Sequence, residues 1–340
     1  MPALLNDFFP NGLFIEHLTV GLTNMILSTI LATLQTVTLV VFATDPIFTG
    51  NPSYLIMLNL SVADLVQLTF HILSGFFIIF QSTFHSWIDK VSGALINSGC
   101  VAYTQMTMLL AINRFFIICY PHHFQSLFTI RSVKIWIVCV WLFGASFFSV
   151  YMSPIVGVSF TPSDYMWGVV GQQSVLLGYC EYYSALFAMI ITFTAYVVIA
   201  SKLVRTPKSD ILASRTRSSE KRILLQAVII SSIVAFLQYM WYNYETFVAP
   251  SKWAFFAINL LWIVTCGINP LLYLFLNVTF RSKVYGMVKN RANSLVSPSA
   301  RLFLVPVRLH PCGKRFISEH ISTPQLSSTL PNNCTEGRNP

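Results

Sequence analysis

The sequence predicts an all-α membrane protein, a bundle of seven transmembrane helices, and three observations support this fold class. First, 55% of the 340 residues are hydrophobic and only 10% are charged, whereas soluble globular domains have a charged share of about 25%. Second, the few charged residues are bunched, so long apolar stretches separate them. Third, Lys and Arg are concentrated in alternate loops, which is typical of a chain that crosses a membrane repeatedly.

Six stretches without Asp, Glu, Lys or Arg are each long enough for a spanning helix of about 20 residues. They are His17 to Thr44, Val91 to Asn113, Ile135 to Ser163, Tyr182 to Ser201, Ile223 to Tyr244 and Trp253 to Phe280. A seventh stretch, Ser53 to Phe80, is interrupted only by Asp64. The stretches are longer than the ~10–14 residues of a buried core helix. They also lack the alternation of β-barrel strands, so they predict helices.

The basic residues predict the orientation of the chain. On one side of the membrane, residues 114–134, 202–222 and 281–340 hold 19 of the 21 Lys and Arg residues, and the other side has Lys90 and Lys252. Because cytoplasmic loops are enriched in Lys and Arg, the C-terminus is expected inside and the N-terminus outside. The formal charge of +9 follows from this topology and does not indicate a nucleic-acid partner.

Three parts are expected along the chain. Residues 1–16 form a short extracellular tail without the basic segment of a cleavable signal peptide. Residues 17–290 form the seven-helix domain, which ends in a short amphipathic helix on the inner lipid leaflet. Residues 291–340 form a polar cytoplasmic tail that we expect to be disordered.

Asp64 is the only acid placed well inside an expected span. A carboxylate in the hydrocarbon needs polar partners, and the candidates are Asn59, Ser61 and Asn269. Such a polar network either ties helices together or rearranges in function. Pro270, next to Asn269, removes one backbone hydrogen bond and predicts a kink in the last span.

Three motifs together resemble those of the rhodopsin-like G-protein-coupled receptors. They are NLSVADL in helix 2, Asn113-Arg114-Phe115 at the end of helix 3, and NPLLY in helix 7, and the resemblance covers about residues 17–290. The phrases AINRFFIICYPHHFQSLFTIRSVK and SEKRILLQAVI resemble the nematode serpentine chemoreceptors of the Srx and Srsx type. The resemblance implies a plasma-membrane receptor, for example of sensory cells, without a cofactor.

The expected partners also follow from this resemblance. Such a receptor binds an external small molecule or peptide and activates a heterotrimeric G protein through the cytoplasmic ends of helices 3, 5, 6 and 7. Arg114 would meet the G protein, with Tyr196 and Tyr273 swinging toward it. Asp64 and Asn269 would form the switch network between the two ends.

The chain departs from the family pattern at several positions. Asn113 stands where the family has an acid before the arginine, and Glu220 is the candidate substitute for that acid. Tyr103 stands where the family often has a small polar residue lining a sodium site. Members of the family have a disulfide between helix 3 and the second outer loop. In this chain, Cys100 and Cys180 are the pair available for it. Because Cys100 is expected below the rim, this bridge would require the loop to dip inward.

Aromatic and polar residues on the outer halves of helices 3, 5, 6 and 7 are candidates for the ligand pocket. They are Ile96, Cys100, Tyr182, Tyr183, Gln238, Trp241, Tyr242, Glu245, Asn259 and Trp262. Tyr and Trp are also common as belt residues at membrane interfaces, so each of them has this second interpretation. Glu181 and Glu245, near the outer rim, are either solvated or meet a cationic ligand.

The alternative class is a seven-span transporter or a ligand-gated channel subunit. Transporters commonly contain inverted repeats and several ionisable groups near the midplane. Here the number of spans is odd and Asp64 stands alone. An enzyme is not expected, because the spans contain no HExxH, GxSxG or paired-acid arrangement.

Overall fold

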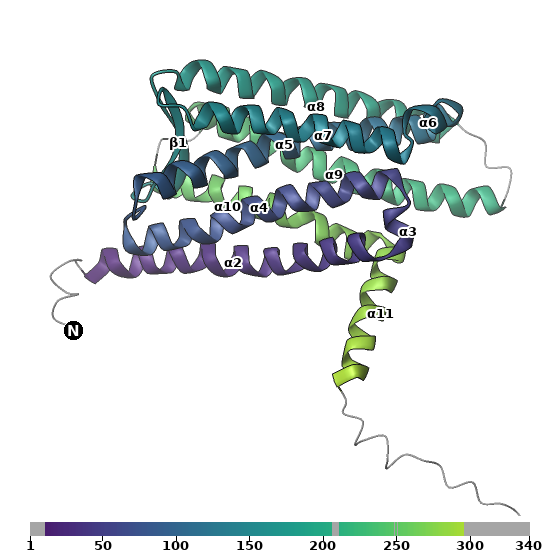
Figure 1. Cartoon of the computed structure of the whole chain (residues 1–340), viewed down its shortest axis with the longest axis horizontal. Helices are drawn as coiled ribbons and strands as arrows, with labels where there is room; N and C mark the ends of the chain where they lie inside the picture. The colour runs from purple at the N-terminus through teal and green to yellow at the C-terminus, as the bar shows by residue number, and fades with distance from the viewer. Residues whose placement is uncertain (1–10, 206–210, 248, 250, 296–340) are drawn as a thin grey trace, which may run out of the picture. The chain divides into compact units, whose positions relative to one another are not determined.

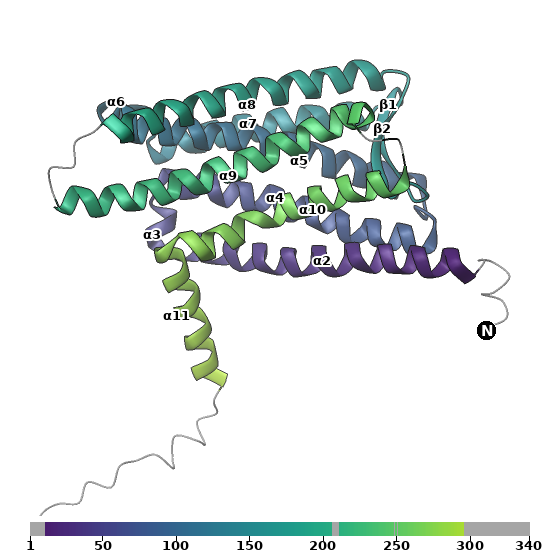
Figure 2. The same cartoon turned by 180° about the vertical axis from the view of Figure 1, so that it is seen from behind.

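Seven long helices run side by side in the computed structural model (Figure 1; Figure 2). The structure describes residues 11–205, 211–247, 249 and 251–295, without the side chains of residues 11–13, 125, 211–223, 245, 247, 288 and 290–295. The helices long and apolar enough to span a membrane lie in α2 (Asn11–Thr44), α4 (Pro52–Phe80), α5 (Ser86–Cys119), α7 (Ile130–Tyr151), α8 (Ser174–Arg205), α9 (Ile211–Phe247) and α10 (Lys252–Leu276). The prediction of a seven-span, all-α membrane protein is thus confirmed.

Side chains just before the helices begin several of these elements. The side chain of Asn51 accepts a hydrogen bond from the Ser53 amide at 2.9 Å, and Pro52 occupies the first turn of α4. Ser251 accepts from the Ala254 amide at 3.2 Å at the start of α10. These caps satisfy backbone donors that a helix N-terminus otherwise leaves unpaired.

The short elements between the spans include two features that sequence analysis did not predict. These are α3 (Pro46–Thr49) and α6 (Pro121–Leu127), each with a proline in its first turn. The expected helix after the last span is α11 (Val278–Leu295). Its Phe280 is buried against Tyr273, with the ring centroids 5.8 Å apart, and its Lys283 forms an ion pair with Asp45 at 2.8 Å.

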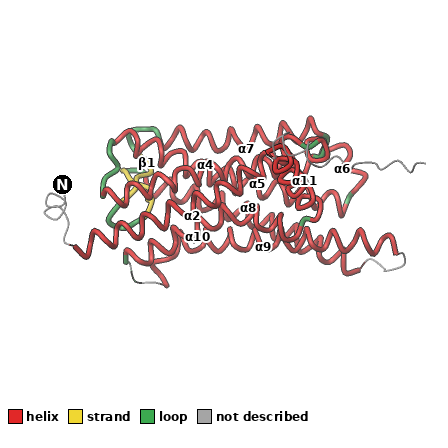
Figure 3. Tube along the Cα trace, turned by 90° about the horizontal axis from the view of Figure 1, so that it is seen from below, coloured by secondary structure: helices red, strands yellow, loops and turns green. Residues whose placement is uncertain are grey.

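The second outer loop folds into an antiparallel hairpin of β1 (Val156–Thr161) and β2 (Met166–Gly171), which the sequence analysis did not predict. Figure 3 shows the hairpin at the same end of the bundle as the start of α2. Trp167 is fully buried, and its ring centroid lies 6.2 Å from that of Phe77 in α4. The hairpin therefore has its own apolar contacts with the bundle and is not merely a connection.

The hairpin is joined to the top of α5 by hydrogen bonds and close packing. Asp89 accepts hydrogen bonds from the Ser159 hydroxyl at 2.5 Å and from the Phe160 amide at 2.9 Å. One turn further along α5, a Cβ added to Gly93 would lie 2.0 Å from the carbonyl oxygen of Val158, so only glycine fits there. Asp89 and Gly93 therefore make the connection that the resemblance assigned to a disulfide.

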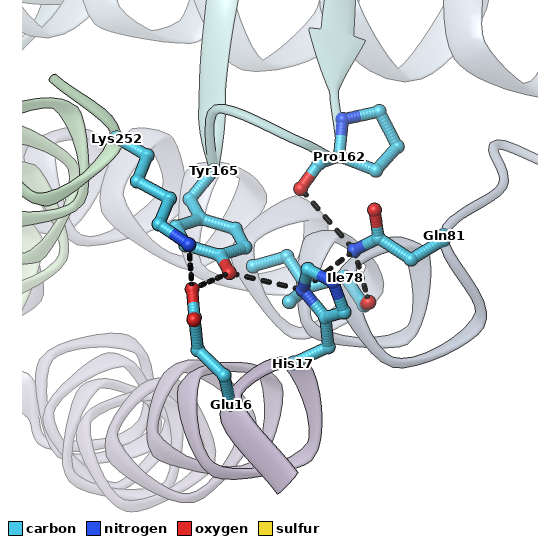
Figure 4. Close-up of polar contacts among 7 residues, drawn as sticks. All are labelled: Glu16, His17, Ile78, Gln81, Pro162, Tyr165 and Lys252. Carbon is cyan, nitrogen blue, oxygen red and sulfur yellow. Dashed lines mark hydrogen bonds and ion pairs between the residues drawn. The ribbon is translucent and has the colours of Figure 1, made fainter. Parts of the chain in front are cut away.

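The turn of the hairpin is clamped to α2 and α10 by Tyr165, which has a positive φ of 60° (Figure 4). Its hydroxyl donates a hydrogen bond to Glu16 Oε1 at 2.6 Å, and Lys252 forms an ion pair with the same oxygen. Gln81 also donates a hydrogen bond to the Pro162 carbonyl at 3.3 Å. Burial, and then the bond to Glu16, raise the pKa of Tyr165, which keeps its hydroxyl as a donor.

Candidate functional site

The outer half of the bundle encloses a cavity between α5, α8, α9 and α10, with room for about two water molecules. It is lined by Asn97, Cys100, Val101, Thr104, Gln105, Glu181, Ser184, Ala185, Leu237, Gln238, Trp241, Tyr242 and Trp262. Polar groups and large aromatic rings are mixed in this lining, as is common in small-molecule sites. The cavity is therefore the candidate ligand site.

Half of the predicted ligand residues line this cavity, and four of the others lie elsewhere. Those in the lining are Cys100, Gln238, Trp241, Tyr242 and Trp262. Tyr183 is 61% exposed on the outer surface of α8, as expected of a belt residue. Tyr182 packs against Tyr242 and lines a separate apolar groove on α8 and α9.

Two further predicted residues are buried outside the cavity lining, and one is not described. Ile96 belongs to the apolar core, and Asn259 is fully buried in α10. The side chain of Glu245 lies outside the described residues. The cavity therefore does not support a ligand role for Ile96 and Asn259, and the role of Glu245 stays a prediction.

Glu181 lies in the cavity wall and not at the solvated rim where it was expected, because only 4% of it is exposed. Its Oε1 accepts a hydrogen bond from Asn97 Nδ2 at 2.8 Å, and its Oε2 accepts one from the Tyr242 hydroxyl at 3.0 Å. The sequence did contain a signal for this burial. Glu181 shares helical spacing with the small residues Ala185 and Ala188, which mark the inward face of α8.

The floor of the cavity leads toward α4. The rings of Trp241 and Trp262 meet edge to face, with their centroids 4.9 Å apart. Trp262 Nε1 donates a hydrogen bond to Gln67 Oε1 at 2.7 Å. Gln67 is one helical turn from Asp64 on α4, so the cavity floor reaches the level of the buried carboxyl group.

Asp64 accepts two hydrogen bonds at one oxygen, and only one of the donors was predicted. Asn269 Nδ2 lies 2.8 Å from Asp64 Oδ2, whereas Gln35 Nε2, from the first helix, lies 2.6 Å from the same oxygen. Asn269 also donates to the Tyr103 hydroxyl at 3.0 Å. Tyr103 therefore completes the network at the position where the resemblance suggested a sodium site.

The structure places Asn59 outside this network. Its side-chain oxygen accepts a hydrogen bond from Trp141 Nε1 at 2.9 Å, and its nitrogen donates to the Leu55 carbonyl. Asn59 therefore faces α7, because its position on α4 is rotated away from that of Asp64. Gln35 takes the place that was expected for Asn59. A glutamine in the middle of the apolar first span was the available signal.

A second cavity opens in the cytoplasmic half and brings four predicted switch residues together. Arg114, Tyr196, Asn269 and Tyr273 all line it. The rest of its lining is Met57, Leu60, Thr107, Leu110, Gln226, Ala227, Ile230, Ser231 and Asn277. Pro270 lies inside α10 between Asn269 and Tyr273, where the sequence predicts the kink.

Arg114 makes no ion pair with any side chain that the structure describes. Its Nη2 lies 3.9 Å from the sulfur of Met57, which is a weak acceptor. The side chain of Glu220, the expected substitute for the missing acid, lies outside the described residues. Arg114 is therefore held mainly by packing within the described part of the bundle.

The two neighbours of Arg114 point to other partners. Asn113 is fully buried, and its side-chain oxygen accepts a hydrogen bond from the Ser53 hydroxyl at 2.7 Å. Phe115 packs against Phe116 and Tyr120, with both centroid distances 5.5 Å. Asn113 thus links α5 to α4 and does not restrain Arg114 as an acid would.

Cys100 and Cys180 are both free thiols. Cys100 lies in the cavity wall, with its sulfur 3.7 Å from Gln238 Nε2, whereas Cys180 is exposed. The structure therefore does not contain the bridge between them, and Asp89 connects the hairpin to α5 through two hydrogen bonds.

This arrangement of seven spans, with a cavity in each half, defines a seven-helix membrane protein of the rhodopsin-like fold. The crystal structure of squid rhodopsin is similar to this chain with a TM-score of 0.67, covering 81% of this chain and 86% of that chain at 13% identity. The chain belongs to the serpentine-type 7TM GPCR chemoreceptor family Srt, whose family profile matches residues 12–295. No curated protein matches it.

The Srt family corrects the Srx and Srsx assignment suggested by the sequence. That assignment depended on two short phrases at the cytoplasmic ends of helices, whereas the family profile covers nearly the whole bundle. The broader prediction of a multi-pass receptor of the serpentine chemoreceptor type is confirmed. The family consists of receptors, not of enzymes. Because this chain belongs to it, coupling to a G protein is implied.

Proposed function

We propose that this Srt-family chemoreceptor binds a small external cue in the outer cavity and activates a heterotrimeric G protein at the cytoplasmic cavity. The observation that carries the proposal is the meeting of Arg114, Tyr196 and Tyr273 in one inner cavity. An arginine there, without an ion-pair partner among the described side chains, is available to a protein that docks from the cytoplasm. Receptor residues contribute no covalent chemistry to this function.

Two hydrogen bonds on adjacent turns of α4 support coupling between the two cavities. Trp262 lines the outer cavity and bonds to Gln67, which lies one turn from Asp64. Asp64 bonds to Asn269, which lines the inner cavity. A cue that binds one arrangement of these helices more tightly than the other would shift the population toward that arrangement. The Trp262–Gln67 and Asp64–Asn269 hydrogen bonds are the contacts through which such a shift would pass.

The experiment uses the full chain with an N-terminal tag, which also tests that the N-terminus is outside. Surface exposure is confirmed first, and G-protein dissociation is then recorded across a panel of volatile and soluble cues. Arg114→Ala is expected to abolish dissociation while cue binding remains. Arg131→Ala is the matched control, because Arg131 is a cytoplasmic arginine at the start of α7 outside the cavity lining.

A transporter or ligand-gated channel would give a different result. Cue-dependent current or uptake that persists in cells lacking G proteins would overturn the receptor proposal. If Arg114→Ala still causes full G-protein dissociation at equal surface expression, the inner cavity is not the site of G-protein activation, although the chain remains a receptor.

A further inference from the structure

We infer that the cue bound in the outer cavity carries a small protonated amine, and that Glu181 is the residue that binds this group. The inference rests on the proposed function only in taking the outer cavity as the site of the cue. Four observations carry it: the burial of Glu181, its lack of a cationic partner, the direction of its hydrogen bonds, and the composition of the cavity wall.

Glu181 is a buried acid without a counter-charge among the described side chains. The ion pairs in this part of the chain join Lys252 to Glu16 and Lys283 to Asp45, and neither involves Glu181. The groups that donate to Glu181 are neutral, namely the amide of Asn97 and the hydroxyl of Tyr242. Removing a carboxylate from water without a cation is costly, so the site favours a ligand that supplies one.

The hydrogen bonds at Glu181 fit the charged form of the carboxyl group. Each of its two oxygens accepts a hydrogen bond, one at 2.8 Å and the other at 3.0 Å. An ionised carboxylate offers about four acceptor positions, so positions remain for a further donor from the cavity. Asn97 is itself held in place by a second hydrogen bond, to the Tyr151 hydroxyl at 2.6 Å. The acceptor geometry is thus present before a ligand arrives.

The remainder of the cavity wall suits a compact cation. Among the thirteen lining residues, Glu181 is the only one with a formal charge, so an anionic ligand would meet repulsion and find no cation. The rings of Trp241, Tyr242 and Trp262 line the same space, and aromatic faces attract cations within about 6 Å. Because the cavity holds only about two water molecules, a small amine fits better than a bulky one.

The test uses the full chain in lipid nanodiscs and measures binding without any G protein. The probes are methylamine, ethylamine and propylamine, together with the alcohols and carboxylic acids of the same carbon skeletons. Binding is read from tryptophan fluorescence, since Trp241 and Trp262 line the cavity, and from the midpoint of thermal unfolding. At least one amine is expected to bind more tightly than its alcohol and acid counterparts.

Variants of Glu181 assign the preference to this residue. Glu181→Gln keeps the shape but removes the charge, and it is expected to weaken amine binding by about 10- to 100-fold. Glu181→Asp keeps the charge and should retain the preference for amines over alcohols. The control Asp164→Asn removes one negative charge from the hairpin turn, outside the cavity lining, and should leave amine binding unchanged.

Two results would overturn the inference. One is that no amine in the panel binds more tightly than its matched alcohol, and the other is that Glu181→Gln binds the amines as the original chain does. Failure of the proposed function has a different signature. Amine binding that depends on Glu181 without G-protein dissociation would sustain this inference and contradict the proposed signalling.

Discussion

Gln35 Nε2 lies 2.6 Å from Asp64 Oδ2, which joins the first membrane helix to the second in the buried centre of the bundle. Asn269 of α10 reaches the same oxygen, so three helices meet at one carboxyl group. Polar contacts of this kind fix the relative positions of membrane helices, because an unpaired polar group in hydrocarbon is costly. The same group also lies between the outer and the cytoplasmic cavities.

Replacing Gln35 by leucine is expected to destabilise the bundle by about 1–2 kcal/mol, because Asp64 loses one of its two donors. Thermal unfolding of the purified receptor in detergent measures the effect. The matched control is Thr36→Val on the exposed face of the same helix, where the hydroxyl bonds only to the Ala32 carbonyl. Equal midpoints for both variants would show that Gln35 does not stabilise the three-helix junction.

Asp89→Ala is expected to release β1 from the top of α5, because two hydrogen bonds to the hairpin are lost. Hydrogen bonds to charged groups contribute about 1.5–3 kcal/mol each when a partner is removed. Faster hydrogen exchange in β1 measures the release. Asp164→Ala, in the hairpin turn, is the control and should leave exchange in β1 unchanged. Unaltered protection of β1 in Asp89→Ala would contradict this role.

Tyr165→Phe is expected to loosen the hairpin turn from α2 while the buried ring keeps its packing. The variant loses the hydrogen bond to Glu16 and the contact of the hydroxyl with His17 Nδ1 at 2.9 Å. We expect a loss of about 1.5–3 kcal/mol, measured by thermal unfolding. Tyr179→Phe is the control, since Tyr179 is 56% exposed on α8. The prediction fails if both variants unfold at the same temperature.

Attachment of α11 to the first inner loop is expected to weaken in acid. The hydrogen bond from Lys283, and then that from the Ile47 amide, hold the pKa of Asp45 below its ordinary value of 3.8. Because the folded pKa is lower than the unfolded one, the stabilisation is complete above pH 3.8 and is lost as the pH falls through the folded pKa.

Hydrogen exchange across α11, measured between neutral pH and pH 3, checks this dependence after correction for the intrinsic exchange rate. Lys283→Met removes the main cause of the lowered pKa and should reduce the pH-dependent change. Lys289→Met is the control on the same helix. An identical pH profile in Lys283→Met would exclude the ion pair as the origin.

Glu220→Gln is expected to raise signalling in the absence of a cue. Asn113 stands beside Arg114 where the family has an acid that restrains the arginine. We assign this restraint of Arg114 to Glu220, at the cytoplasmic end of α9. Ligand-free G-protein dissociation at equal surface expression measures the change. Asp210→Asn removes the other acid of the cytoplasmic segment 202–222 and serves as the control. Unchanged basal signalling in Glu220→Gln would show that Glu220 does not take the role of the missing acid.

The sequence by itself determined the seven spans, their orientation and the receptor class. Hydrophobic length and the distribution of Lys and Arg are local properties, and they depend on the bilayer more than on the packing of helices. The motifs around Asp64, Arg114 and Asn269 also occur in continuous stretches of chain. These features could therefore be predicted without knowing which helices touch.

The tertiary structure decided which polar groups meet. Gln35 and not Asn59 reaches Asp64, and Glu181 turns into the cavity. Each of these depends on the rotation of one helix against another. A rotation of about 100° separates adjacent residues on a helix, so small changes in packing exchange an inward side chain for an outward one. The physical reason is that helix packing, and not local composition, selects the partners of buried polar groups.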